Sequence, residues 1–167
     1  ENQSNNWVKI GNDIEGDNTN DSFGTTVSIS QDGSIVVIGA TNYQGGTEGY
    51  VKVYKNISGT WTQIGDTIVG EAAADRLGNS VSISLDGSII AIGIKDRTTV
   101  NGTLSGEVKV YQDIAGTWTQ LGNSILGIDS NNNFGYSVSL SGNGQLLAIS
   151  AYNGDIIDTN SGQVSVY

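Results

Sequence analysis

Carboxylates are the only side chains of this sequence whose types and spacing suggest catalytic chemistry. The 167 residues include 17 Asp and Glu but no His and no Cys, which excludes triads with a histidine base, thiol nucleophiles and most zinc sites. A pair of carboxylates could still hydrolyse a glycosidic bond. The candidate carboxylates in the polar segments are Asp13, Asp17, Asp21, Glu71, Asp75, Asp129, Asp155 and Asp158. Because their positions differ among the sequence repeats described below, we expect solvated residues that keep an acidic protein soluble, not an active site.

The same polar segments supply the candidate ligand-binding residues. Tyrosine rings offer stacking surfaces, and Asn, Asp and Thr side chains can hydrogen-bond to sugar hydroxyl groups. The eight candidates are Asp17, Asp21, Tyr43, Asp75, Arg76, Asp129, Tyr152 and Asp155. The alternative is that these segments are hydrophilic turns that bind nothing. We expect no catalytic residue, no metal ligand and no cofactor.

A sequence repeat defines the elements that must position these side chains. Its landmarks are a tryptophan, a Phe-Gly or Leu-Gly pair, and a closing Val-x-Val-Tyr string. The first two landmarks recur with the same spacings, 54 and then 57 residues. They stand at Trp7, Trp61 and Trp118, at Phe23-Gly24, Leu77-Gly78 and Phe134-Gly135, and at the strings that end in Tyr54, Tyr111 and Tyr167. The repeat units are therefore about 7–54, 61–111 and 118–167, within a single segment 1–167.

Each unit predicts four short β-strands. In the second copy, residues 60–68 have strand composition, and residues 80–84 alternate apolar and polar side chains with a period of two. Asp86-Gly87 predicts a two-residue hairpin turn. The nearly continuous apolar run at 88–93 predicts a strand that is buried on both faces. Residues 107–111 complete the unit.

The sequence Phe-Gly-Thr-Thr-Val-Ser-Ile-Ser at 23–30, followed by an apolar run into Ile-Gly-Ala at 38–40, resembles the FG-GAP repeat. This repeat forms the blades of the integrin α-subunit propeller and of many bacterial and algal surface proteins. It recurs at 77–94 with Leu in place of Phe, and at 134–151 with Ser150 in place of the second glycine. The resemblance implies an all-β fold, a β-propeller built from four-stranded antiparallel blades, with three blade repeats per chain.

One part of the family pattern is missing. Calcium-binding FG-GAP blades look like Asp-x-Asp/Asn-x-Asp-Gly-x-x-Asp between their first two strands, which provides oxygen ligands at alternate positions. Here that loop is shortened to 31–33, 85–87 and 142–144, with at most one carboxylate in each. One carboxylate is too few to hold a hard cation. We therefore expect no calcium site and interpret Asp32 and Asp86 as turn residues.

Two families of connections are expected on one face of a propeller, because the strands of a blade alternate in direction. They are residues 16–22, 70–76 and 127–133, and residues 41–48, 95–105 and 152–161. Loops on a rigid scaffold are the usual place for recognition, so this face is the predicted binding face. The repeated tryptophans are expected to pack between blades. The alternation of Lys52 and Lys109 with valine predicts a third strand that is more exposed than the second.

The ends of the chain raise the question of ring closure. If blades run from the Phe-Gly strand to the tryptophan strand, the last blade lacks its outer strand and residues 1–14 are left over. Rings have about four to eight blades, so three cannot close one. Either further blades of a longer parent chain complete the ring, or identical chains associate and each N-terminal strand completes a neighbour's last blade. Two chains would then form a six-bladed ring.

Charge and composition limit the partners. The formal net charge is −10, and the seven basic residues are scattered singly. A nucleic-acid partner would require a basic stripe, which the sequence lacks. We expect no membrane insertion, because no apolar stretch approaches the roughly 20 residues of a membrane-spanning helix. Acidity, the absence of thiols and the resemblance together favour an extracellular or cell-surface location.

The function predicted from these features is that of a non-enzymatic propeller module for adhesion, recognition or structural display, with a protein or glycan ligand. One alternative is a soluble lectin-like protein that binds glycans multivalently. A carboxylate-based glycoside hydrolase is another, and Asp75 and Asp129 would be the residues to test. The last alternative is that the chain is an excised fragment without a function of its own.

Overall fold

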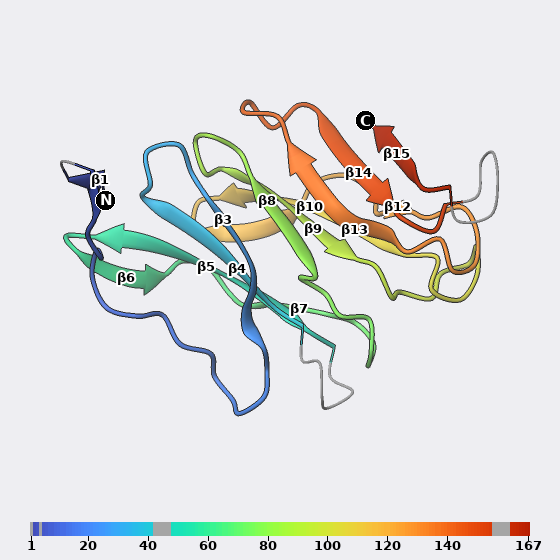
Figure 1. Ribbon diagram of the computed structural model, residues 1–167, viewed down its shortest axis with the longest axis horizontal. Helices are drawn as coiled ribbons and strands as arrows, with labels where there is room; N and C mark the ends of the chain where they lie inside the picture. The colour runs from blue at the N-terminus through green and yellow to red at the C-terminus, as the bar shows by residue number, and fades with distance from the viewer. Residues whose placement is uncertain (1, 4, 42–47, 155–160) are drawn as a thin grey trace.

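The computed structural model describes residues 2–3, 5–41, 48–154 and 161–167, and every regular element described there is a β-strand (Figure 1). Three antiparallel sheets follow one another along the chain, from left to right in Figure 1. The N-terminal strands β1 (Asn2–Gln3) and β2 (Asn6–Trp7) form a separate pair. In this described part of the chain, no helix has the length and apolar character needed to cross a membrane.

The three large sheets share one strand order, from an inner strand outwards. Sheet 1 contains β3 (Phe23–Ile29), β4 (Ile35–Ala40), β5 (Tyr50–Ile57) and β6 (Thr60–Gln63), with β7 (Ile68–Val69) also paired to β5. Sheet 2 contains β8 (Ser80–Ile83), β9 (Ile89–Ile94), β10 (Glu107–Ile114) and β11 (Thr117–Gln120), with β12 (Ile125–Leu126) also paired to β10. Sheet 3 contains β13 (Phe134–Leu140), β14 (Leu147–Ala151) and β15 (Gln163–Val166).

The sheets are offset by one strand from the sequence repeats. Each tryptophan strand pairs with the closing strand of the preceding repeat, with Asn56 opposite Trp61 and Asp113 opposite Trp118. Sheet 3 consequently ends at β15, and none of the described residues provides it with an outer tryptophan strand.

The outer strand is interrupted, whereas the sequence predicted one strand over 60–68. β6 ends at Gln63, and Gly65 adopts a left-handed conformation with φ 67° before the chain returns as β7. The Ile64 amide still donates to the Val53 carbonyl at 2.9 Å, so the break is a local bulge within one outer strand. Gly122 has φ 73° at the same place in sheet 2.

The hairpins between the inner and second strands are longer than the two-residue turn predicted at Asp86-Gly87. The Ser84 amide donates to Ile89 O, and the Gly87 amide donates to Ser84 O, so four residues form the loop. Only Gly87 has a positive φ there, because the Asp86 carboxylate instead accepts hydrogen bonds from Ser84 Oγ and the Ser88 amide at 2.6 and 3.0 Å. Asp32 makes the same contacts, so the interpretation of both as turn residues is confirmed.

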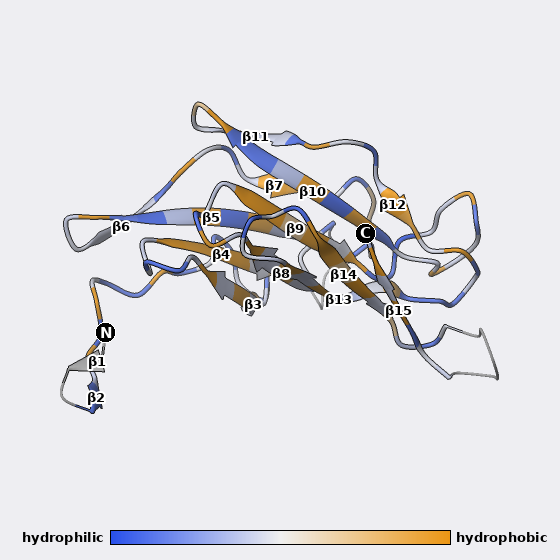
Figure 2. Ribbon diagram, turned by 90° about the horizontal axis from the view of Figure 1, so that it is seen from above, coloured by the Kyte–Doolittle hydropathy of each residue, from blue (hydrophilic) through white to orange (hydrophobic). Residues whose placement is uncertain are grey.

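The hydrophobic core lies between the sheets, which pack face to face. One cluster between sheets 1 and 2 includes Val37, Val51, Val53, Leu77, Val81, Ile83, Ile90, Ile92, Ile94 and Trp118. A second, between sheets 2 and 3, includes Ala91, Val108, Phe134, Val138, Leu147, Ile149 and Ala151. The second strands β4 and β9 are buried over most of their length and are hydrophobic in Figure 2, which confirms the predicted burial on both faces.

The three tryptophans differ in burial, although their sequence context repeats. Trp118 packs between sheets 1 and 2 as predicted and is 9% exposed, whereas Trp61 is half-buried. Trp7 is 84% exposed, because no sheet precedes the first repeat within the described residues.

Candidate functional site

The two families of connections meet at one end of the molecule, as predicted. Backbone bridges join them: Leu77 N donates to Glu48 O at 3.1 Å and Asn133 N donates to Leu104 O at 3.0 Å. Gly106 also forms an isolated parallel bridge with Phe134. The loop that enters each inner strand is therefore fixed against a connection of the neighbouring sheet.

A depression of about 520 Å³ opens where the three inner strands come together, and we call it the central depression. Three equivalent positions of β3, β8 and β13 form its floor, since the residues after each Phe-Gly or Leu-Gly pair face it in every sheet. Its lining residues are Thr25, Thr26, Val27, Thr41, Arg76, Asn79, Ser80, Val81, Lys95, Tyr136, Ser137 and Val138.

The central depression is cationic although the chain is strongly acidic. Arg76 and Lys95 line it, and no Asp or Glu is among the described residues of the lining. The Asp96 carboxylate lies behind them, 3.1 Å from Arg76 Nη1 and 2.8 Å from Lys95 Nζ. The described lining thus presents two cationic side chains, Arg76 and Lys95, to an anion in the depression.

Local structure fixes both cations in place. Arg76 has φ 58°, and the equivalent residues Ser22 and Asn133 also adopt left-handed conformations, so this turn recurs before every inner strand. The Lys95 amide donates to Asn79 Oδ1 at 2.8 Å, and Asn79 Nδ2 donates to Gly135 O at 3.1 Å. Asn79 therefore links the backbone of sheet 2 at the depression to the backbone of sheet 3.

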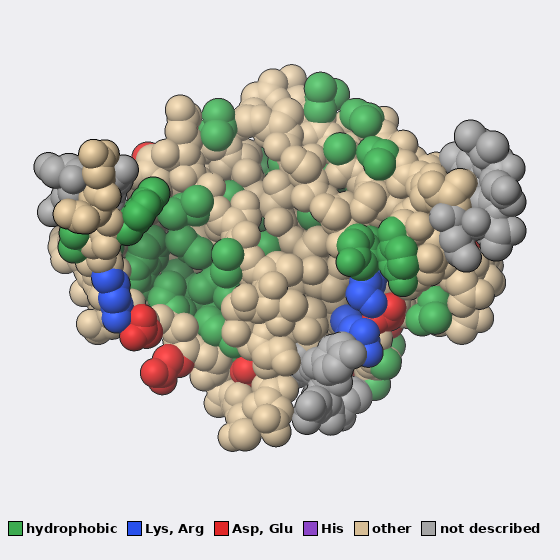
Figure 3. Space-filling view, viewed as in Figure 1, with side chains coloured by type: hydrophobic (Ala, Val, Ile, Leu, Met, Phe, Trp, Pro, Cys, Tyr) green, Lys and Arg blue, Asp and Glu red, His purple; other side chains and the backbone are tan. Residues whose placement is uncertain are grey.

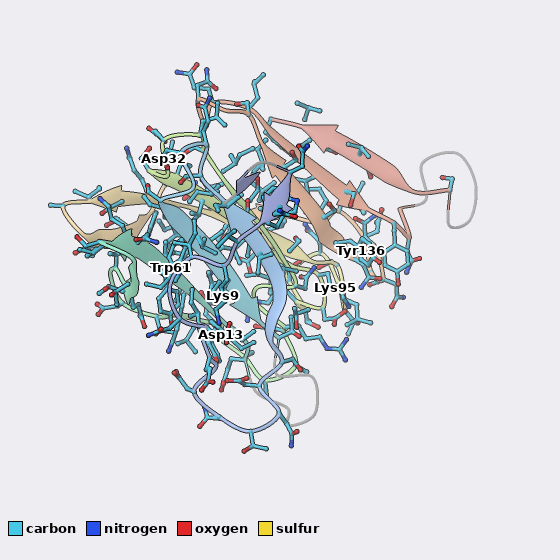
Figure 4. The ribbon with its side chains drawn as sticks, turned by 60° about the vertical axis from the view of Figure 1, so that its left-hand side comes forward. Lys9, Asp13, Asp32, Trp61, Lys95 and Tyr136 are labelled. Carbon is cyan, nitrogen blue, oxygen red and sulfur yellow. The ribbon has the colours of Figure 1, made fainter. Side chains whose placement is uncertain are left out.

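An aromatic pair forms one rim of the depression. The rings of Tyr136 and Tyr152 lie 4.6 Å apart, centroid to centroid, and each side chain is half exposed. Tyr136 lines the depression beside Lys95, and Figure 4 shows these two labelled side chains in the same region of the molecule. Exposed rings beside cations are suited to planar or sugar-like ligand surfaces that carry a negative group.

The candidates predicted from the sequence separate into four groups. Arg76 lines the central depression and Tyr152 contacts Tyr136 at its rim, so the structure brings these two together. Asp129 is exposed in the loop before β13 and does not line the depression. Tyr43 and Asp155 lie outside the described residues.

The other acidic candidates are structural. The Asp21 side chain is 5% exposed and accepts hydrogen bonds from the amides of Asn18 and Phe23 at 3.1 Å and from the Tyr50 hydroxyl. Burial opposes ionisation, but these hydrogen bonds outweigh it and lower the pKa of Asp21. Asp75 is equally buried and pairs with Arg97 at 2.5 Å. The prediction that most loop acids are solvated was wrong for these two.

Lys52 and Lys109 are buried, each 6% exposed, although a more exposed third strand was predicted. Lys52 Nζ lies 2.5 Å from Asp17, and Lys109 pairs with Glu71. The loops that precede β3 and β8 thus each place a carboxylate over the buried lysine of their own sheet. The alternation with valine was a signal for a half-buried strand, but the loops cover its polar face as well.

A larger ionic cluster surrounds Lys109. Arg97 donates to Asp75 and Glu71 at 2.5 and 2.7 Å and lies 3.4 Å from Glu107. The hydrogen bond and charge of Lys109 lower the pKa of Glu71. Carboxylates held ionised in this way cannot supply a proton near neutral pH.

Metal ligands do not gather within the described residues, where no group of three or more His, Cys, Asp or Glu could hold an ion. The acids that lie near one another are those of the ionic cluster, and Arg97 and Lys109 already neutralise them.

Sequence reasoning missed Lys95, Tyr136 and Asn79 as residues of the depression. Asn79 and Tyr136 occupy the variable position directly after each Phe-Gly or Leu-Gly pair, where Thr25 stands in the first repeat. That variation between otherwise similar repeats was the available signal. Lys95 carried none, because only the packing of the sheets shows which side of the connection faces the inner strands.

Antiparallel sheets that pack face to face around three neighbouring inner strands define a β-propeller. Residues 128–167 match the family model of the FG-GAP repeat, which confirms the resemblance found in the sequence. No curated protein matches the chain.

Solved propellers share the fold. The chain is similar to a proposed 6-phosphogluconolactonase from Bacteroides uniformis, with TM-score 0.53, 16% identity, and coverage of 83% of this chain and 34% of that one. The β-propeller domain of Cps50 (Swd1) from Myceliophteria thermophila has TM-score 0.52, 13% identity and coverages of 86% and 38%. Hydrazine synthase from Kuenenia stuttgartiensis has TM-score 0.51, 21% identity and coverages of 75% and 36%. At these identities the likeness shows the fold alone, and the chain spans little more than a third of each structure.

Proposed function

We propose that this chain is a non-enzymatic recognition module of an extracellular or cell-surface protein, and that its central depression binds the acidic group of a glycan. The main support for this proposal is that two cations, Arg76 and Lys95, line a concave site in a chain of net charge −10. Long-range repulsion from such a chain disfavours anions in general, so a site that concentrates positive charge favours a specific anionic ligand.

Two features of the lining favour a saccharide over a peptide. Hydroxyl groups dominate the polar lining, and they belong to Thr25, Thr26, Thr41, Ser80 and Ser137. Those of Thr25, Thr26 and Ser80 already donate to backbone carbonyls and can accept from sugar hydroxyls, whereas those of Thr41 and Ser137 can also donate. The half-exposed Tyr136 and Tyr152 rings are tilted by 53° to each other, and each offers an apolar face against which a sugar ring can pack.

Binding without chemistry is supported by the state of the carboxylates. Glycoside hydrolysis requires one carboxyl group that is protonated near neutral pH. The pKa values of Asp21 and Glu71 are lowered, and Asp75 is paired with Arg97, so these residues favour the ionised state or a structural role. The central depression contains no acid among its described residues.

The test compares acidic glycans with neutral glycans of the same backbone in a binding assay with the purified chain. We expect the acidic members to bind, and Arg76→Gln or Lys95→Gln to weaken binding by about tenfold or more, since a charge-assisted hydrogen bond contributes about 1.5–3 kcal/mol. Lys9→Gln is the matched control, because Lys9 pairs with Asp13 on an exposed segment away from the depression.

Equal binding of neutral and acidic glycans, or equal effects of Lys9→Gln and Lys95→Gln, would contradict the proposal. Binding of acidic peptides but not of acidic glycans would retain the anion site and reject the glycan.

A further inference from the structure

Sheet 1 exposes on its outer side the apolar residues that the other two sheets bury. Val27 and Ile29 of β3 are 64% and 58% exposed. The equivalent residues of sheet 2, Val81 and Ile83, are 9% and 7% exposed beneath sheet 1, and Val138 of sheet 3 is 8% exposed beneath sheet 2. Figure 3 shows hydrophobic side chains gathered over β3 and β4, and a hollow of about 340 Å³ lies beside Val27 and Ile29.

Sheet 3 exposes the complementary surface at the other end of the chain. Val164 and Val166 of β15 are 69% and 68% exposed. Their equivalents in sheet 1, Val51 and Val53, are 0% and 1% exposed because sheet 2 covers them. The face that carries these third-strand valines packs on the inner-strand face of the next sheet twice within the chain, between sheets 1 and 2 and between sheets 2 and 3. Sheet 3 leaves the first kind of face uncovered, and sheet 1 leaves the second kind uncovered.

The N-terminal segment occupies the position of an outer strand whose own sheet is not among the described residues. Trp118 Nε1 donates to Ile64 O, in the outer strand of the preceding sheet, at 3.3 Å. Trp61 Nε1 donates in the same way to Ile10 O at 3.0 Å. Residues 8–11 thus contact the outer strand of sheet 1 in the way that residues 62–65 contact the outer strand of sheet 2.

A tryptophan–glycine contact repeats along these outer strands and is left incomplete at both ends. A Cβ added to Gly65 would lie 2.7 Å from Trp118 Cδ1, and one added to Gly11 would lie 3.2 Å from Trp61 Cδ1. The equivalent Gly122 of sheet 2 has nothing within 4 Å, and Trp7 is 84% exposed. Gly122 at one end therefore lacks a tryptophan partner among the described residues, and Trp7 at the other end is a tryptophan at the repeat position that such a partner would have.

We propose that two copies of this chain close one six-bladed ring, in which the N-terminal strand of each copy becomes the outer strand of sheet 3 of the other. The occupant of both free faces is then a sheet of the same repeat, as it is where such faces are covered within the described part of the chain. Two copies are the number that brings three sheets per chain into the range of about four to eight blades. The contact joins two different surfaces and closes after two copies.

The repeat also predicts the register of the new strand pair. Val51 lies opposite Ile68, and Val108 lies opposite Ile125, so Val164 should lie opposite Ile14 of the second copy. Paired residues of antiparallel strands have Cα atoms about 4.5–5.5 Å apart, within the range that a disulfide can bridge. Because the chain contains no cysteine, an introduced pair has no native competitor.

The first experiment is oxidative cross-linking of the full chain carrying Ile14→Cys and Val164→Cys. We expect a covalent dimer of twice 17.4 kDa on a non-reducing gel. The control carries Ile14→Cys and Val100→Cys, because Val100 is a fully solvated valine of the 95–105 connection and lies on neither free face. A cross-linked dimer from the control but not from the designed pair would overturn the proposal, as would an intramolecular disulfide in the designed pair.

The second experiment measures the solution mass of single-face variants. Val166→Lys and Ile29→Glu should each be monomeric, whereas Val100→Glu should remain dimeric like the natural sequence. Mixing the first two variants should restore a dimer, because one of its two contacts is then unmodified and the other joins opposite charges. A monomeric natural chain over the accessible concentrations would overturn the proposal, and so would a dimer that neither face variant affects.

Ser150 makes the contact between copies different from those within the chain. Gly39 and Gly93 lie against the carbonyl oxygens of Gly78 and Gly135, where an added Cβ would overlap with backbone. Ser150 stands at that position in sheet 3 and must hold the second copy slightly farther away. Ser150→Gly is therefore expected to strengthen the dimer, whereas weakening by this substitution would contradict the proposed packing.

Discussion

At the scale of single residues, buried lysines distinguish this chain from a sheet that alternates apolar and solvated positions. A buried ammonium group loses its hydration, and only a well-placed carboxylate offsets that cost. Burial opposes the charge of Lys109, but its hydrogen bond to Glu71 and the charges of Glu107 and Glu71 outweigh this and raise its pKa. The loops that precede the inner strands therefore help to hold the sheets together as well as shaping the proposed binding face.

Glu71→Gln tests this role. The substitution keeps the shape but removes the charge that Lys109 and Arg97 share, so we expect the free energy of unfolding to fall by about 1–3 kcal/mol. Urea unfolding followed by circular dichroism measures the change. Asp13→Asn is the control, because the Lys9–Asp13 pair is exposed and contributes at most about 1 kcal/mol. Equal effects of the two substitutions would show that the cluster around Lys109 is not stabilising.

At the scale of elements, glycines in the second strands set how closely neighbouring sheets approach. Gly93 of β9 packs against the Gly135 carbonyl of β13, and Ser80 Oγ donates to the same oxygen at 2.8 Å. Gly39 and Thr26 repeat this arrangement against Gly78. The second glycine of the repeat is thus a packing residue, since the φ of Gly93 is not left-handed.

Gly93→Ala is expected to separate sheets 2 and 3. Backbone atoms cannot move aside as a flexible side chain can, so we expect a loss of about 1–3 kcal/mol in the free energy of unfolding. Ser150→Ala at the equivalent position of sheet 3 should change the stability of the monomer less, because no sheet among the described residues covers Ser150 and only the hydrogen bond from the Ser137 amide is lost. Thermal unfolding of both variants provides the comparison, and similar midpoints would show that the sheets do not depend on this approach.

At the scale of the whole molecule, the distribution of lowered pKa values determines how the protein responds to acid. The pKa of Asp32 is lowered to about 2, chiefly by the Ser34 amide and the Ser30 hydroxyl, and those of Asp21, Glu71 and Asp86 are lowered as well. A carboxylate with a lowered pKa in the folded state contributes stability above its ordinary pKa and loses it as the pH falls through the folded value.

We therefore expect stability to fall below the ordinary carboxyl values of 3.8 and 4.5, with most of the loss between about pH 4.5 and about pH 2. The urea midpoint measured from neutral pH downwards checks this expectation. Glu71→Gln and Asp86→Asn should each flatten part of the decline. A midpoint that stays constant through this window would mean that the unfolded chain holds its protons as tightly as the folded one.

Local structure was predictable from the sequence. Repeated landmarks such as Trp61 and Leu77-Gly78 identified the FG-GAP pattern, period-two alternation placed the inner strands, and continuous apolar runs placed the second strands, because these signals depend on residues close together in the chain. The gathering of both families of connections on one face followed from strand direction alone. Of the eight candidate residues, Arg76 and Tyr152 were found in or beside the central depression.

Which side chains lie together depends on how the sheets pack. Lys95, Asn79 and Tyr136 share the depression because the inner strands of sheets 2 and 3 lie side by side, a contact between residues distant in sequence. The same packing buries Lys109 beneath a loop and leaves Val27 and Val164 uncovered, although their repeats read alike. Burial is a property of what lies opposite a residue, and a repeated sequence cannot show at which copy the neighbouring sheet is missing.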